Sequence, residues 1–210
     1  MWRAPTDEAA LAARWGSAEP FPHLIIDDFV AADQLDALLA ILEDEGVERY
    51  EGDIFRFEAS APEPTTDALT ELRDGFAAVL APTFARITGK PVTRVDMRAF
   101  AYRPGHYLLP HSDHREGLTR ALAYAYYLPS PDPPRGGELE LFACRVEHGE
   151  IVATDSARMI EPRANRLVLF DVSDISLHQV REVLGGLRIS LAGWFYASEP
   201  QGEQVPLGYP

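Results

Sequence analysis

The change in the pattern of residue types at Val92 constrains the fold of this chain more than any other sequence feature. From Val92 onward, short segments rich in β-branched and aromatic residues are separated by Gly, Pro and Asp, a pattern typical of β-strands joined by turns. No helical periodicity interrupts these segments, so the crossovers that a parallel sheet requires are absent from the pattern. The sequence therefore predicts an antiparallel sandwich or barrel. The expected strands are Arg94–Tyr102, Leu118–Leu128, Glu138–Phe142, Ala157–Ile160, Arg166–Phe170, His178–Val183 and Arg188–Tyr196.

The first third of the chain is predicted to be mainly helical. Apolar residues recur at helical spacing in three segments, Thr6–Trp15, Asp33–Glu45 and Thr66–Ile87. Pro82 is expected to kink or break the third helix, because proline lacks the N–H that the helix interior needs. A strand is predicted over Phe21–Phe29, between the first two helices.

The composition indicates one globular domain. The chain has 210 residues, of which 46% are hydrophobic and 25% are charged, as is ordinary for globular proteins. We expect residues 1–91 to supply helical support and a first strand, residues 92–197 the β core, and residues 198–210 a tail. The sequence has neither a run of about 18 apolar residues nor a basic start followed by an apolar block, so no membrane segment or secretory signal is expected.

Charge and cysteine content bear on partners and compartment. Cys144 is the only cysteine, so no intrachain disulfide can form, and a cytoplasmic location is expected. The formal net charge of −14 repels phosphate backbones, and nucleic acid is not an expected partner. The charge would attract a basic protein or peptide, although acidity for solubility alone is the favoured explanation. The oligomeric state stays open.

His111, Asp113 and His178 are the residues with the clearest chemical meaning. The first two stand at i and i+2, so in an extended segment their side chains leave the same face, and His178 must come from a distant strand. Two imidazoles and one carboxylate are the facial triad that binds non-heme Fe(II) and leaves coordination positions open for catalysis. Mn(II) and Zn(II) also suit such ligands. A single histidine is more often hydrogen-bonded or exposed than a metal ligand, so the argument rests on the complete set.

Arg188 and Ser190 indicate what would lie beside the metal. Alternation along a strand places both on one face, and an inward guanidinium needs a carboxylate partner because an unpaired buried charge is costly. A 2-oxo acid cosubstrate carries such a carboxylate; a surface arginine paired with a protein carboxylate is the alternative. Tyr102 and Tyr126 are candidates for a phenolic hydrogen bond to the same group. Core packing is the competing interpretation for both tyrosines, and the favoured one for Tyr126.

The segment from Val95 to Tyr196 resembles the 2-oxoglutarate- and Fe(II)-dependent oxygenases, in particular their prolyl 4-hydroxylase-like branch. The FPHLIIDDF segment near the N-terminus is similar to the opening strand of that family. The matching pieces in the core are HSDH (His111–His114), LAYAYYLPSPDPPRGGELELF (Leu122–Phe142), NRLVLFDVSDISLHQV (Asn165–Val180) and GLRISLAGWFY (Gly186–Tyr196).

The resemblance implies a mainly β fold, a double-stranded β-helix or jelly roll supported by N-terminal helices. It implies His111, Asp113 and His178 as iron ligands and Arg188 as the partner of the distal carboxylate of 2-oxoglutarate, with Tyr102 and Ser190 as accessory contacts. Gly136 and Gly137 match a turn that precedes a strand in the family.

The implied activity is hydroxylation of a C–H bond with Fe(II), 2-oxoglutarate and O2, with ascorbate as an open requirement. A prolyl or similar residue of a protein or peptide is the leading substrate. The alternatives are hydroxylation of a free amino acid or other small metabolite, and a β-helix module that binds metal or ligand without turnover. Asp53–Thr65 and Arg103–Pro110 are candidate lids over the substrate, or simple connecting loops.

Overall fold

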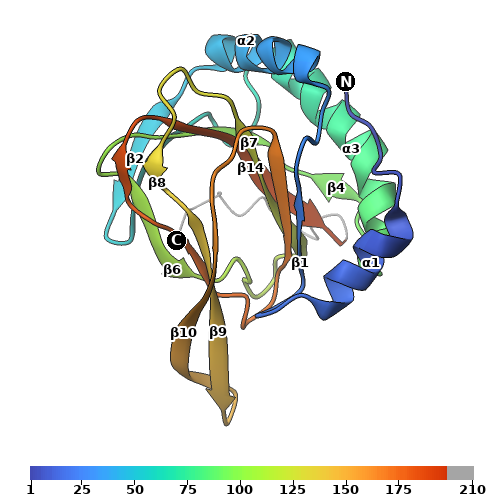
Figure 1. Cartoon of the computed structure of the whole chain (residues 1–210), viewed down its shortest axis with the longest axis vertical. Coiled ribbons are helices and arrows are strands. Elements are labelled where there is room, and N and C mark those ends of the chain that lie inside the picture. The colour runs from blue at the N-terminus through green and yellow to red at the C-terminus, as the bar shows by residue number, and fades with distance from the viewer. Residues whose placement is uncertain (198–210) are drawn as a thin grey trace.

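The computed structural model describes residues 1–197 (Figure 1), so the expected tail lies outside the described residues. Within these residues the chain forms three α-helices, one short 3-10 helix and fourteen strands. The helices are α1 (Glu8–Ser17), η1 (Ala32–Gln34), α2 (Leu35–Glu45) and α3 (Asp67–Thr88). The strands are β1 (His23–Ile26), β2 (Glu48–Gly52), β3 (Phe55–Ala59), β4 (Arg94–Val95), β5 (Arg98–Tyr102), β6 (Tyr107–His111), β7 (Arg120–Leu128), β8 (Arg135–Gly136), β9 (Leu139–Glu147), β10 (Glu150–Ile160), β11 (Arg166–Asp171), β12 (His178–Val180), β13 (Val183–Gly185) and β14 (Arg188–Tyr196).

One curled antiparallel sheet forms the body of the molecule. Its strands follow the order β1-β11-β7-β14-β5-β3-β6-β12-β9-β10, with β2 beside β3 and β4 beside β14. Side chains from β9, such as Leu141, pack in one cluster with Val168 of β11 and Ala125 of β7, so the two halves of the sheet face each other. The mainly β architecture with helices near the N-terminus agrees with the sequence prediction.

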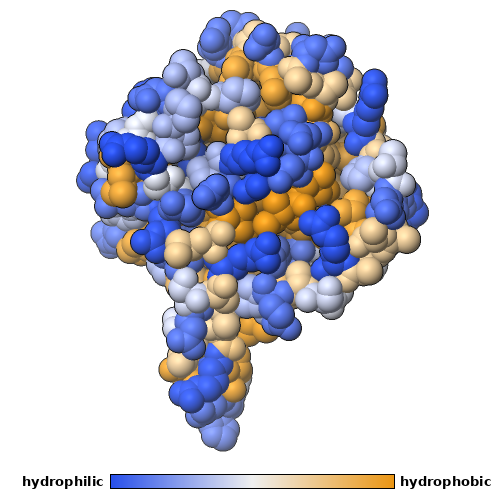
Figure 2. All heavy atoms as spheres, viewed as in Figure 1, coloured by the Kyte–Doolittle hydropathy of each residue, from blue (hydrophilic) through white to orange (hydrophobic). Residues whose placement is uncertain are grey.

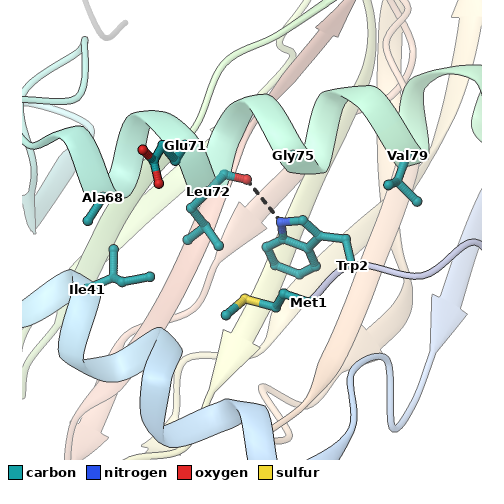
Figure 3. A pocket seen from close by; sticks show the side chains of 8 residues that line it. All are labelled: Met1, Trp2, Ile41, Ala68, Glu71, Leu72, Gly75 and Val79. Carbon is teal, nitrogen blue, oxygen red and sulfur yellow. Dashed lines mark hydrogen bonds between the residues drawn. The ribbon is translucent and has the colours of Figure 1, made fainter.

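The helices cover the outer face of the larger half of the sheet (Figure 1). Residues that alternate along β7 and β14 divide between two faces: Leu191 packs with the helices, whereas Trp194 belongs to the inner cluster. Trp2 contributes to the helical layer, where its indole N–H donates to the carbonyl of Leu72 at 3.0 Å (Figure 3). Because both faces of these strands are apolar, the sheet is buried on its inner and outer sides.

Helix α3 continues through Pro82, so the helix is not broken there. It begins after Thr66, whose hydroxyl accepts from the N–H of Leu69 at 3.2 Å, and it covers 22 residues. A proline in a helix interior costs about 3 kcal/mol. Leu80 and Phe84 are completely buried on either side of it, and burying each contributes roughly 1.5–3 kcal/mol, so packing outweighs the local cost.

The hairpin of β2 and β3 and the strand β6 were not expected from the sequence. Strand β3 pairs with β2, β5 and β6, so it is part of the sheet. The two candidate lids, Asp53–Thr65 and Arg103–Pro110, therefore contain strand segments held by ladder hydrogen bonds. Both strands are only partly buried, unlike the almost fully buried strand β7.

A long hairpin of β9 and β10 projects from the body (Figure 1). Leu141 of β9 lies opposite His178, the first residue of β12, and β9 continues to Glu147 beyond that point. The projecting part carries polar side chains together with apolar ones (Figure 2). Val146, Ile151 and Val152 are among the exposed large hydrophobic residues.

Candidate metal centre and cosubstrate pocket

The sheet brings the two histidines of the predicted triad side by side. His111 is the last residue of β6 and His178 the first of β12, and the register places them directly opposite each other. Asp113 follows β6 by two residues and lies in a segment without regular structure. One atom from each of these three residues lies within 4.8 Å of the others, so the three side chains can share one ion.

The atoms that face the shared point are the ones that metals prefer. Nε2 of His111 lies 3.8 Å from one carboxylate oxygen of Asp113, and Nε2 of His178 lies 3.6 Å from the other. The Nδ1 atoms point away: that of His111 is 2.9 Å from the carbonyl of Leu109, and that of His178 is 3.0 Å from the carbonyl of Ser176. Since a carbonyl only accepts, each Nδ1 carries the proton and each Nε2 keeps a free lone pair.

Burial and neighbouring side chains together set the protonation states that a metal site needs. Burial and the neighbouring His178 lower the pKa of His111 to about 4, so its imidazole is neutral at physiological pH. Burial alone would raise the pKa of Asp113, but attraction to His178 and His111 and a hydrogen bond from Trp194 outweigh it and hold the pKa below its usual value. A neutral imidazole and an ionised carboxylate are the forms that bind metal.

A buried arginine lies in the same cavity as the triad. Arg188 is 4% exposed, and its Nε has no hydrogen-bond partner among residues 1–197. Its Nη2 donates to the hydroxyl of Tyr127 at 3.4 Å. The ring of Tyr102, directly opposite on β5, lies 4.7 Å from the guanidinium carbon. Ser190 lines the same cavity as Arg188 and the triad, so the expected pair on β14 shares one face.

Gly137 makes room for this arginine. Its φ is +74°, and an added Cβ would lie 2.8 Å from Val183 and 3.1 Å from Cδ of Arg188. A side chain there would therefore be strained and would displace the guanidinium. The turn containing Gly136 and Gly137 shapes the arginine pocket.

Comparison with known proteins identifies the family. The 2OG-Fe(II) oxygenase superfamily matches residues 97–196, which include the triad and Arg188. Prolyl 3-hydroxylase OGFOD1 of Mus musculus is 34% identical over 206 residues, covering 92% of this chain and 35% of that protein. The Xenopus laevis protein of the same name is 30% identical over 200 residues, covering 91% and 38%.

The chain belongs to the 2-oxoglutarate- and Fe(II)-dependent oxygenase superfamily. It spans about a third of the length of the two OGFOD1 relatives. Membership implies Fe(II), 2-oxoglutarate and O2, as the sequence resemblance did.

Solved structures of the superfamily share the fold. A prolyl-4-hydroxylase from Pseudomonas putida superposes with a TM-score of 0.68 at 23% identity, covering 90% of this chain and 99% of that one. The α-ketoglutarate-dependent epimerase SnoN also superposes with a TM-score of 0.68, at 12% identity, covering 97% and 96%. The jelly-roll prediction is confirmed, but a fold that hosts both a hydroxylase and an epimerase does not determine the reaction.

The residues of this chain fit both implied groups. Asp113 is an ionised carboxylate in a buried site, beside two imidazole nitrogens with free lone pairs, and a divalent cation would compensate its charge. Arg188 is a buried guanidinium that still has an unsatisfied N–H, which a carboxylate would accept. The cavity therefore offers ligands that suit a cation at the triad and a guanidinium that suits an anion at Arg188.

Tyr126 does not reach this pocket, contrary to its inclusion among the cosubstrate contacts. Its hydroxyl donates to Oδ1 of Asn165 at 2.8 Å, and its ring packs with Trp2 and Phe29 in the helical layer. Tyr127, the next residue of β7, faces inward and contacts Arg188. The sequence missed Tyr127 because both faces of β7 are apolar, so alternation did not show which face is inner.

The histidines near the motif take no part in the triad. His114 is exposed and lies 3.3 Å from Asp174, and His106 precedes β6 at the end opposite His111.

A separate hollow of about 390 Å³ lies between α2, α3 and the N-terminal residues (Figure 3). Its lining is mainly apolar, with Glu71 as the one acidic residue, and it contains no histidine. No helix within residues 1–197 is long and apolar enough to cross a membrane.

Proposed function

We propose that this chain is an Fe(II)- and 2-oxoglutarate-dependent dioxygenase that hydroxylates prolyl residues of a protein or peptide. The observation that carries the proposal is the convergence, in one cavity, of the His111, Asp113 and His178 ligand atoms with the guanidinium of Arg188. A metal site alone would also suit a hydrolase or a binding module. A buried arginine in the same cavity suits the oxidation of a 2-oxo acid.

We assign the metal to the three triad residues and the distal carboxylate of 2-oxoglutarate to Arg188. When bound, iron and 2-oxoglutarate supply O2 activation coupled to oxidative decarboxylation, which yields succinate, CO2 and a hydroxylated product. The chain positions these groups: the two histidines present Nε2, and Arg188 orients the dicarboxylate. Ser190 and Tyr102 line the same cavity, and Tyr127 accepts a hydrogen bond from the guanidinium of Arg188.

The apolar inner face of the sheet keeps the cavity dry. Leu139, Phe170 and Val180 line it, and each is less than a tenth exposed. Exclusion of water strengthens the charged contacts made by Arg188 and Asp113. It also limits side reactions of the activated oxygen with solvent.

We propose C3 of the prolyl ring as the reacting position. Two relatives, at 34% and 30% identity, are named prolyl 3-hydroxylases, whereas the prolyl-4-hydroxylase from Pseudomonas putida is related at 23% identity. Chromatographic separation of 3- and 4-hydroxyproline in hydrolysed product would distinguish the two positions.

A protein substrate is favoured over a small metabolite by the hairpin of β9 and β10. It stands at the end of the sheet that bears the triad, since β9 extends past His178. Its exposed Val146, Ile151 and Val152 offer contact area that a free amino acid would not use. The net charge of −14 supports a protein rather than a nucleic acid as partner, and the single cysteine supports a cytoplasmic location.

The test is an assay on intact proteins and on small molecules in parallel. A proteome extract is incubated with the protein, Fe(II), 2-oxoglutarate and O2, with and without ascorbate, and searched by mass spectrometry for prolyl residues that have gained one oxygen. A panel of free amino acids is assayed for the same change, with succinate as a common readout. Prolyl hydroxylation that requires Asp113 would support the proposal. Hydroxylation of a free amino acid alone would replace it with the small-metabolite alternative.

A further inference from the structure

Asp113 needs support that strand pairing does not supply. His111 and His178 are held by the ladder between β6 and β12, whereas Asp113 lies between β6 and β7 in a segment without regular structure. Ser112 anchors the start of this segment, since its hydroxyl donates to the carbonyl of Ser173 at 2.8 Å. That contact fixes the backbone before Asp113 but leaves the carboxylate to be oriented by its own neighbours.

Two residues of the inner wall contact Asp113 from different sides. The indole N–H of Trp194 donates to the Asp113 side chain, and Nη1 of Arg120 donates to its backbone carbonyl at 3.3 Å. The guanidinium carbon of Arg120 also lies 3.6 Å from the centre of the Trp194 ring. Arg120 therefore touches the backbone of Asp113 and the ring that holds its carboxylate.

We propose that Trp194 and Arg120 are positioning residues that hold the Asp113 carboxylate in its metal-binding orientation. This inference rests on the proposed metal site and specifies how this chain maintains it. Trp194 acts directly on the carboxylate, and Arg120 acts on Asp113 partly through Trp194.

The chemistry of the contacts suits this role. An indole N–H can only donate, so Trp194 stabilises the ionised carboxylate and restricts its rotation, as partners beyond the ligand shell do at metal sites. A guanidinium over an aromatic face is attracted by the ring quadrupole, and it fixes the ring whose N–H makes the hydrogen bond. Trp194 and Asp113 are both less than a tenth exposed, so solvent does not replace these contacts.

Strand β14 links this support to the cosubstrate site. Arg188, Ser190 and Trp194 lie on its inner face and line one cavity. Strand β14 thus carries Arg188, the proposed partner of the cosubstrate carboxylate, at one end. It carries Trp194, which holds the carboxylate of the metal ligand Asp113, near the other end. The position of the Asp113 carboxylate is therefore linked through one strand to that of the Arg188 guanidinium.

The test measures Mn(II) binding to the full chain in the absence of cosubstrate. Trp194→Phe keeps an aromatic side chain and removes the indole N–H, and it is expected to weaken Mn(II) binding about tenfold or more. Trp2→Phe is the matched control, because it also removes a buried indole hydrogen bond, to Leu72, away from the triad (Figure 3). Co(II) absorption spectra of both variants report the ligand geometry independently of affinity.

Arg120→Met gives a second test that leaves the inner face of β14 intact. Electrostatics alone predicts tighter metal binding when a positive charge near the site is removed, whereas loss of positioning predicts weaker binding. We expect weaker binding by several-fold, and a double variant with Trp194→Phe whose loss of affinity is smaller than the two single losses combined. Wild-type affinity and an unchanged Co(II) spectrum in folded Trp194→Phe, or tighter binding by Arg120→Met, would overturn this inference while leaving the proposed function standing. A wild-type chain that binds no Mn(II) would overturn both.

Discussion

His178 lies directly opposite His111 on paired strands, with ring centroids 4.3 Å apart. Each ring directs Nδ1 to the carbonyl of the residue two positions earlier in its own chain segment. The same local contact therefore orients two rings that are far apart in sequence, and both Nε2 atoms face Asp113. These backbone contacts fix both ring orientations, so the two Nε2 atoms are preorganised as ligands.

Removal of the carboxylate tests the metal site most directly. Asp113→Ala is expected to abolish Mn(II) binding in a calorimetric titration, because two neutral imidazoles alone are a weak site for a divalent cation. His114→Ala is the control, since His114 adjoins the motif but is exposed and lies beside Asp174. Equal affinity in the wild-type chain and Asp113→Ala would show that the metal binds elsewhere.

Arg188→Met is expected to weaken 2-oxoglutarate binding by about 100-fold or more, because a buried charge pair is lost, and to leave Mn(II) affinity unchanged. In a thermal-shift assay with Mn(II), 2-oxoglutarate should stabilise the wild-type chain and not the variant. Without ligand the variant should be no less stable than the wild type, since the buried guanidinium has an unsatisfied N–H.

The control is Arg163→Met, which removes an exposed arginine near Asp27. It should respond to 2-oxoglutarate as the wild type does. A variant that keeps the wild-type response would contradict the carboxylate contact.

The two adjacent tyrosines of β7 should behave differently. Tyr127→Phe removes the hydroxyl beside Arg188 and is expected to raise the 2-oxoglutarate concentration required for turnover by a few-fold. Tyr126→Phe removes the hydrogen bond to Asn165 and should lower the free energy of unfolding by about 1 kcal/mol without changing that requirement. The opposite pattern in succinate assays would reverse the assignment of the inner face.

Shortening the hairpin tests the preference for a protein substrate. Residues 143–155 are replaced by an Asn-Gly turn, which suits a two-residue hairpin, and the paired positions Phe142 and Ser156 are retained. We expect a large loss of activity on an intact protein and little change on a short peptide spanning the same proline. A companion variant with Val146, Ile151 and Val152 changed to Thr keeps the hairpin length and should show part of the same loss. Equal activity on the intact protein would remove the hairpin from substrate recognition.

Glu45 should make stability depend on pH. Its buried carboxylate accepts from the N–H of Thr65 at 2.7 Å and from the N–H and hydroxyl of Thr66 at 3.0 and 2.7 Å. Burial alone would raise the pKa of Glu45, but these hydrogen bonds outweigh it and hold the pKa below its ordinary 4.5. The stabilisation is therefore complete above pH 4.5 and is lost as the pH falls through the lower pKa of the folded state.

The corresponding variant is Glu45→Ala, with a loss of roughly 2 kcal/mol expected at pH 7. In urea unfolding, the difference between variant and wild type should shrink as the carboxylate is protonated. Glu43→Ala removes an exposed carboxylate of the same helix. It should lower the free energy of unfolding little, both at pH 7 and below the pKa of Glu45. A pH-independent difference would indicate that Glu45 acts through packing.

The sequence alone determined the class of fold and the candidates for the chemistry. Helical periodicity predicted α1, α2 and α3, and alternation placed Arg188 and Ser190 on one face of β14, because these patterns depend only on residues close together in the chain. One local signal was misleading, because Pro82 does not end the helix α3. The helix continues there because Leu80 and Phe84 are buried on either side of the proline.

Tertiary structure decided which candidates meet. The register of β12 against β6 places His178 beside His111, and the curl of the sheet determines that Tyr127, not Tyr126, faces Arg188. The contacts of Trp194 and Arg120 with Asp113 likewise join residues from separate segments. Long-range strand pairing and the choice of inner face depend on how the whole sheet buries its two apolar sides, and local periodicity carries no information about either.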